Sequence, residues 1–149
     1  MIRVRLEYYD KILGTPALKL LLNGWHELSE QGVIGDISVG INWDHKAIVA
    51  FGTEESPAWK DDPVGVLGFQ HFDWANYFNT TIAWVTPALR RHGVHTQMWE
   101  FLILKAQELK VLKITSSTHV DNLASQKMHN KQGRPLHGYS YEYCVPKVG

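Results

Sequence analysis

The stretch from Thr81 to Arg134 decides the fold, and it reads TIAWVTPALRRHGVHTQMWEFLILKAQELKVLKITSSTHVDNLASQKMHNKQGR. Its first part, Ile82 to Val85, is a short apolar run typical of a strand, and Pro87 lacks the N–H that a longer strand needs. Apolar residues then recur at helical spacing from Val94 to Leu109, and a β-branched, alternating run follows Lys110. The stretch therefore predicts a βαβ unit with parallel strands.

The turn between this strand and its helix carries the residue types of an anion site. Arg90, Arg91 and His92 lead into Gly93, which permits close approach of the backbone. The first turn of a helix presents N–H groups that have no partner within the helix, and the helix dipole adds positive charge there. A pyrophosphate fits such a turn, although an ordinary βαβ connection with solvent-exposed arginines explains the spacing equally well.

The order Val85-x-Pro87-x-x-Arg90-x-x-Gly93 resembles the coenzyme A pyrophosphate loop of the GCN5-related N-acetyltransferase (GNAT) superfamily. The signature of that family is Arg or Gln, two residues, Gly, one residue, and then Gly or Ala. In this chain the last place is His95, which departs from the signature.

A second motif supports the resemblance. In the family, the next strand ends near an Asn, followed by Ala or Ser three residues on, Tyr seven residues on, and Gly-Phe at the end of the helix. Here those places hold Asn122, Ser125, His129, Gly133 and Arg134, so the Tyr and Phe places differ. The similarity covers about residues 64–133.

The resemblance implies that acetyl-CoA is the co-substrate and that no metal is needed. Its pantetheine arm is expected between two splayed strands, with the pyrophosphate on the N–H groups of residues 91–96. The cofactor-binding residues expected on this ground are Trp84, Val85, Arg90, Arg91, His92, Gly93, Val94, His95, Thr96, Asn122 and Ser125.

The resemblance further implies an acyl-CoA-dependent N-acetyltransferase that moves an acetyl group directly to an amine. His129, in the place of the family's Tyr, is the expected proton donor to the departing thiolate. The general base stays open, because several relatives carry an acid on the strand before the loop, where this chain has Asn79, Thr80 and Thr81. His71, Asp73 and Glu100 are the candidates, in that order, since the first two end a neighbouring strand.

A catalytically inactive CoA-binding or regulatory module is the alternative, which the departures at His95, His129 and Arg134 favour slightly. The acceptor is open between a small molecule and a protein, and a homodimer is also left open. Cys144 is expected to be a small apolar filler, and Trp59 either folds back onto the core or meets a ligand.

The remaining chain predicts the other elements of an α/β (α+β) fold. Residues 1–149 should form one domain, with a mixed, mostly antiparallel sheet of about six to seven strands flanked by helices. The expected segments are a strand at 2–8, a helix from Pro16 with Thr15 as its cap, a hairpin of 37–43 with 46–52, a loop at 53–63, a strand at 64–72, a turn at 73–78 and a last strand at 136–145.

The composition of the chain limits the kinds of binding partner that we expect. The formal net charge is zero, so no bulk attraction to nucleic acid or to a membrane is expected. One cysteine excludes a disulfide framework within the chain, and the first ten residues lack the apolar segment of a signal peptide. A cytoplasmic location is therefore the expectation.

Overall fold

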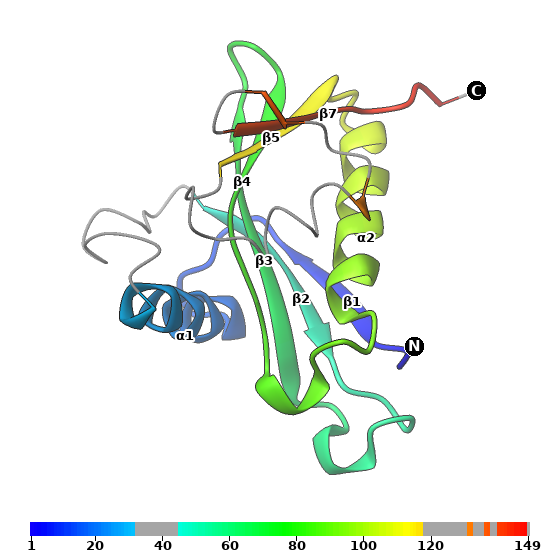
Figure 1. Cartoon of the computed structure of the whole chain (residues 1–149). Helices are drawn as coiled ribbons and strands as arrows, with labels where there is room; N and C mark the ends of the chain where they lie inside the picture. Colours follow the sequence, from blue (N-terminus) through cyan, green and yellow to red (C-terminus); the bar gives the residue numbers. More distant parts are fainter. Residues whose placement is uncertain (32–44, 118–130, 133–135, 138–139, 149) are drawn as a thin grey trace.

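A seven-stranded mixed sheet forms the centre of the computed structural model, which describes residues 1–31, 45–117, 131–132, 136–137 and 140–148 (Figure 1). The spatial order of the strands is β1-β2-β3-β4-β5-β7-β6. The elements are β1 (Arg5–Tyr9), α1 (Pro16–Glu30), β2 (Lys46–Phe51), the 3-10 turn η2 (Pro57–Trp59), β3 (Pro63–Phe72), β4 (Tyr77–Val85), the 3-10 turn η3 (Pro87–Leu89), α2 (Val94–Glu108), β5 (Lys113–Ser117), β6 (Leu136–His137) and β7 (Ser140–Cys144).

The predicted βαβ unit is β4, α2 and β5. Among the described strands β4 and β5 pair in parallel, whereas the other neighbours pair antiparallel. The mixed, mostly antiparallel sheet and the central βαβ crossover are thus confirmed. The strand β4 begins at Tyr77, so the turn before it is shorter than the sequence suggested.

The helix α1 covers one face of the sheet. Thr15 caps it as predicted, since the Ala17 N–H donates to Thr15 Oγ1, and Pro16 occupies its first turn. A Cβ on Gly24 would lie 2.8 Å from Trp84 Cβ, so glycine lets this helix pack directly on β4. The helix runs unbroken through Gly24.

The helix α2 covers the opposite face (Figure 1). Its buried stripe, Val94, Met98, Leu102 and Ala106, packs on a core that includes Phe69, Phe78 and Ile114. Gly93 is its N-cap with φ of +82°, a left-handed conformation that favours glycine. The predicted start of the helix near Gly93 is confirmed.

The parallel pairing of β4 with β5 stops part-way along β4. The register runs from Tyr77 with Lys113 to Thr80 with Ser116, while β4 continues to Val85 alongside β3. A bulge marks the point of divergence: Leu67 of β3 pairs with Ala83, whereas Phe69 pairs with Thr80. Within the described residues, β4 therefore has a closed half, paired on both edges, and an open half that is paired with β3 alone and is uncovered by β5.

Two expected strand arrangements are wrong. Because β2 pairs with β1 on one edge and β3 on the other, it has no edge for a hairpin with residues 37–43, which lie outside the described residues. The single last strand is instead two strands, β6 and β7, which pair antiparallel through Leu136 with Tyr141 and His137 with Ser140. Alternation of side chains alone does not separate one long strand from two short ones.

The structure also decides two predictions about single residues, Cys144 and Trp59. Cys144 is exposed on β7, so it is not the apolar filler that was expected. Trp59 is half-buried and packs against the α2-side core, which decides for the folded-back alternative.

Candidate functional site

The turn from η3 into α2 forms the centre of the candidate site. The first hydrogen bond of the helix ladder runs from the Gln97 N–H to the Gly93 carbonyl, so the N–H groups before Gln97 stand at the open end of the helix. Arg91 is left-handed with φ of +65° and is exposed, and it enters no ion pair with a described residue. The helix start and this cation together form an anion-binding corner.

The N-terminal segment lies against the same corner, as Figure 1 shows. The Ile2 N–H donates to the His92 carbonyl at 2.8 Å, and the Gln97 amide donates to the Ile2 carbonyl at 2.6 Å. A Cβ on Gly93 would lie 2.7 Å from Met1 Cγ, so the side chain of Met1 occupies the space that glycine leaves. The sequence analysis did not anticipate this clamp, because its partners are 90 or more residues apart: Gln97 and Ile2 are separated by 95.

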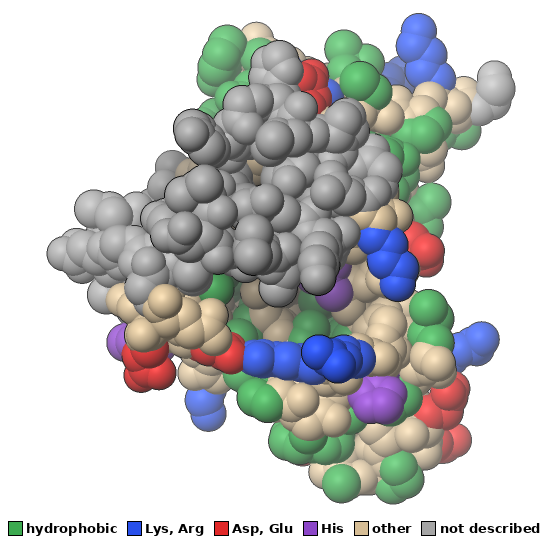
Figure 2. Space-filling model, in the orientation of Figure 1, with side chains coloured by type: hydrophobic (Ala, Val, Ile, Leu, Met, Phe, Trp, Pro, Cys, Tyr) green, Lys and Arg blue, Asp and Glu red, His purple; other side chains and the backbone are tan. Residues whose placement is uncertain are grey.

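The guanidinium of Arg90 is committed to an acidic partner rather than to the anion corner. Arg90 donates from both terminal nitrogens to the Glu27 carboxylate on α1, at 2.7 and 2.5 Å, and its Nε donates to the Val85 carbonyl. The Trp84 indole N–H donates to the same carboxylate at 2.7 Å. On this face basic side chains lie against acidic ones (Figure 2).

This arrangement changes the electrostatics of the loop. The hydrogen bond from Arg90 lowers the pKa of Glu27, partial burial opposes that shift, and the bond from Trp84 lowers the pKa further. Since Glu27 stays ionised and neutralises Arg90, the positive charge left for an anion comes from Arg91 and the helix start.

A pocket of about 510 Å³ opens beside the first turns of α2. Its lining residues are His95, Thr96, Trp99, Glu100, Ile103, Lys131, Gln132 and Tyr143. The rings of Trp99 and Tyr143 meet edge to face at 5.1 Å, and the Gln132 amide nitrogen lies 2.9 Å from His95 Nδ1. The pocket thus combines an aromatic wall with Lys131, next to the predicted pyrophosphate turn.

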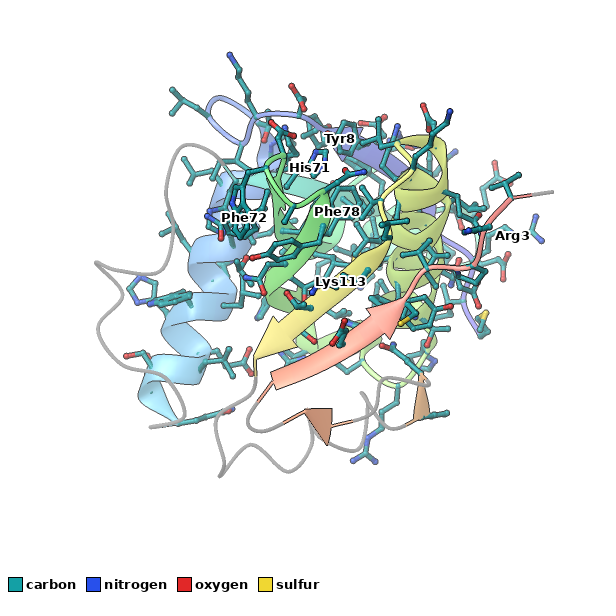
Figure 3. All side chains as sticks on the ribbon, turned by 90° about the horizontal axis from the view of Figure 1, so that it is seen from above. Arg3, Tyr8, His71, Phe72, Phe78 and Lys113 are labelled. Atoms are coloured by element: carbon teal, nitrogen blue, oxygen red, sulfur yellow. The ribbon has the colours of Figure 1, made fainter. Side chains whose placement is uncertain are left out.

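Of the three predicted base candidates, Glu100 lines this pocket, whereas His71 and Asp73 lie elsewhere, at the β3–β4 turn. His71 Nδ1 is 3.3 Å from the Asp73 carboxylate, and its Nε2 is 3.0 Å from Asn76 Oδ1. Its ring meets Phe78 edge to face, on the α2 side of the sheet, and Figure 3 shows the two side by side. These contacts serve to close the turn, and nothing in them brings His71 or Asp73 to the uncovered half of β4.

The other predicted residues divide between the described and undescribed parts. Trp84, Val85, Arg90, Arg91, His92, Gly93, Val94, His95 and Thr96 lie together at the end of β4 and the start of α2. Asn122, Ser125 and His129 lie outside the described residues. Their roles stay predictions.

Comparison with known families decides what kind of domain this is. The model of the acetyltransferase (GNAT) family matches residues 25–133, which is more than half of the chain. The chain belongs to the GNAT family. Among curated proteins, no sequence matches it significantly.

Solved GNAT structures share the fold over nearly the whole chain. Tetrahymena GCN5 is 14% identical with a TM-score of 0.67, and covers 99% of both chains. An aminoglycoside 6'-N-acetyltransferase complexed with coenzyme A is 12% identical with a TM-score of 0.68, covering 97% of this chain and 99% of that one. A GNAT acetyltransferase of Staphylococcus aureus Mu50 is 11% identical with a TM-score of 0.65, covering 95% and 100%. Identities this low establish the GNAT fold and leave the acceptor to the site itself.

No described helix is long and apolar enough to cross a membrane. The described part of the chain also contains no cluster of three or more His, Cys, Asp or Glu side chains placed to hold a metal ion.

Proposed function

We propose that this GNAT protein is an acetyl-CoA-dependent N-acetyltransferase that moves the acetyl group directly to an amine. The observation that carries the proposal is the uncovered half of β4, which leads from the bulge at Thr81 to the helix start at Gly93. Backbone groups on an uncovered strand edge pair with an extended amide-containing chain, as an added strand would. The pantetheine arm of CoA has that form.

The anion corner suits the CoA pyrophosphate. We assign the backbone N–H groups of residues 91–96 to it, with the exposed Arg91 as the charged partner. The pocket beside α2 suits the nucleotide end, because Trp99 and Tyr143 offer aromatic surface and Lys131 offers a cation. Asn122 and Ser125 join this set on the family resemblance.

When bound, acetyl-CoA supplies a thioester whose carbonyl carbon an amine can attack. The chain's own tasks are then to orient the arm along β4, to take a proton from the amine and to give one to the leaving thiolate. His129 is the proposed donor. Its replacement by Phe should lower kcat about a hundredfold with little change in the KM for acetyl-CoA.

Ligand binding provides the first experiment. Millimolar acetyl-CoA at a Kd of about 10 µM stabilises a protein by about 2.7 kcal/mol, which raises Tm by roughly 5–10 °C at this chain length. Desulfo-CoA and inorganic phosphate separate binding of the whole cofactor from simple anion binding. No change in Tm together with no heat in calorimetry would overturn the proposal.

Thiol release provides the second experiment. A panel of a lysine peptide, spermidine, kanamycin and free amino acids is mixed with acetyl-CoA, and free CoA is followed by its thiol. Turnover with any amine confirms the enzyme. Binding of acetyl-CoA without release across the panel would instead assign an inactive CoA-binding module.

A further inference from the structure

His45 is a buried histidine at the centre of the sheet. It stands immediately before β2 with 1% of its surface exposed, and its Nε2 lies 2.9 Å from Thr81 Oγ1 on β4. Within the described residues no other ionisable side chain is buried, because the remaining buried polar residues are Ser56, Thr80, Thr86 and Ser116. A buried imidazole 36 residues away from its hydroxyl partner was not visible to sequence reasoning.

Thr81 stands where β4 leaves β5. Thr80 makes the last parallel pair with Ser116, and the bulge places Thr81 and Ile82 together opposite Gly68 of β3. A Cβ on Gly68 would lie 3.1 Å from Thr81 Oγ1 and 2.7 Å from Leu21 Cδ2. Gly68 therefore makes room for the Thr81 hydroxyl on the α1 face, where His45 meets it.

Among the described residues, the charged groups on the strands beside His45 pair with one another. Lys46, the next residue, pairs with Asp10, and Tyr9 on β1 donates to Glu7. From α1, the residues buried against the sheet are the uncharged Ala17, Leu20, Leu21 and Gly24. Of the ionisable residues of α1, Glu27 is held by Arg90 and Trp84, while Lys19, His26 and Glu30 are exposed.

The side chains across the sheet from His45 are neutral. On β3 the nearest partners are Gly68 and Gln70, and on β4 they are Asn79 and Thr81. The hydroxyl of Thr81 thus connects this imidazole to the uncovered half of β4. A neutral imidazole has one nitrogen that accepts, which suits it to take a hydroxyl proton.

We propose that Thr81 and His45 form the proton relay for the acceptor amine. This inference rests on the proposed function, which brings the thioester to the uncovered edge of β4 beside Thr81. His71 fits the task less well, because it faces the α2 side and its ring nitrogens are engaged by Asp73 and Asn76. The relay also explains how the chain works without an acid at Asn79, Thr80 or Thr81.

The proton balance of the relay is closed. As the amine nitrogen bonds to the carbonyl carbon, Thr81 Oγ1 accepts the amine proton and gives its own proton to His45 Nε2. The carbon–sulfur bond then breaks, and the sulfur leaves with the electron pair and takes a proton from His129. His45 returns its proton to solvent before the next turnover, and solvent reprotonates His129.

The direction of the hydrogen bond can be measured without any ligand. In ¹⁵N NMR of the folded chain, the relay requires His45 Nε2 to be the unprotonated acceptor and Nδ1 to carry the hydrogen at neutral pH. A Thr81→Val variant identifies the signal, because the Nε2 shift should move when the hydroxyl is lost. A protonated Nε2 in the wild-type chain would mean that His45 donates to Thr81, and would overturn the relay.

Kinetics test the relay itself. With acetyl-CoA and the panel amine that turns over fastest, Thr81→Val should lower kcat about a hundredfold and leave the KM for acetyl-CoA within about twofold. Thr81→Ser keeps the hydroxyl and should stay within about fivefold of wild type. His45→Gln should lose kcat as Thr81→Val does, and the double variant should lose little more.

The outcomes separate this inference from the proposed function. If acetyl-CoA raises Tm and Thr81→Val keeps wild-type kcat, the relay is wrong and the acetyltransferase stands. If acetyl-CoA does not raise Tm of the wild-type chain, the proposed function fails and the relay fails with it. Should His45→Gln not fold, the matched pair of Thr81 variants and the NMR reading still decide.

Discussion

The two halves of β4 do different work within one strand. From Tyr77 to Thr80 the strand is hydrogen-bonded to β3 on one edge and to β5 on the other. From Thr81 to Val85 it keeps β3 but runs beyond the described length of β5. Phe78 in the closed half is fully buried, while Ala83, Trp84 and Val85 in the open half are only partly buried. The closed half fixes the sheet so that the open half can present backbone groups.

Shortening a buried side chain in the closed half should have the largest effect on the free energy of unfolding. Phe78 packs on Phe69 at 4.7 Å between ring centres and on His71 at 5.1 Å. Phe78→Ala should cost about 3–5 kcal/mol of unfolding free energy, because it removes buried surface and leaves a cavity. Val85→Ala in the open half should cost about 1 kcal/mol, since that side chain is already partly exposed. Urea denaturation of both variants measures the difference.

Equal losses in the two variants would contradict the division between the halves. Phe78→Leu provides a milder change if Phe78→Ala does not fold, with an expected cost of about 1–2 kcal/mol. Acetyl-CoA affinity should survive Phe78→Leu, because that residue does not line the uncovered edge.

Local signals in the sequence correctly predicted the start of the central βαβ unit. Helical spacing from Val94, the N–H missing at Pro87 and the conformational freedom of Gly93 act over a few residues, so they gave β4, α2 and their turn. The cap of α1 at Thr15 was equally local. Such features depend on residues that are close together in the chain, so they can be predicted from the sequence.

The contacts that tune the open half are long-range, and the sequence did not predict them. Glu27 and Arg90 are 63 residues apart, and His45 and Thr81 are 36 apart. The bulge opposite Gly68 depends on the pairing of three strands and has no marker in the order of residues. The sequence therefore predicted that Arg90 binds an anion, whereas in the folded protein the Arg90 guanidinium is paired with the Glu27 carboxylate.

The next largest effect should come from replacing Gly93 at the start of α2. The quantity affected is the affinity for acetyl-CoA. Val at φ of +82° is strained, and the backbone would shift at the helix start that we propose as the anion site. Gly93→Val should therefore weaken acetyl-CoA binding at least tenfold, as measured by calorimetry. Gly14→Val is the matched control, because Gly14 has φ of +76° with open space around it and lies outside the candidate site.

If Gly93→Val bound acetyl-CoA normally, the pyrophosphate would have to bind elsewhere. If Gly14→Val lost affinity to the same extent, the effect would be general backbone strain. The comparison between the two glycines thus distinguishes a local anion corner from overall destabilisation.

His95 sharpens the assignment of the open end of α2. It stands where the GNAT signature has Gly or Ala, and Gln132 contacts its Nδ1 at 2.9 Å. From its place at the open end of α2 we expect His95 to contact the bound phosphate, so His95→Ala should weaken acetyl-CoA binding by about 1 kcal/mol, or roughly fivefold. Tighter binding would show that the imidazole crowds the cofactor, and unchanged binding would show that it does neither.

The smallest expected effect comes from removing the contact of Glu27 on α1 with Trp84 and Arg90. Since the pKa of Glu27 is lowered from its ordinary value of about 4.5, the carboxylate stabilises the fold above that pH and loses its contribution as pH falls through the lowered pKa. Both partners are partly exposed, so Glu27→Gln should cost only about 0.5–1 kcal/mol at pH 7.

The gap in Tm between wild type and Glu27→Gln should therefore be about 1–4 °C at pH 7 and should close as pH falls through the lowered pKa of Glu27, where the wild-type carboxylate also becomes neutral. Glu54→Gln is the control, because Glu54 is 88% exposed beside Lys60 and should show no gap at either pH. A gap for Glu27→Gln that stays constant with pH would mean that the shape of the side chain, rather than its charge, ties α1 to the open half of β4.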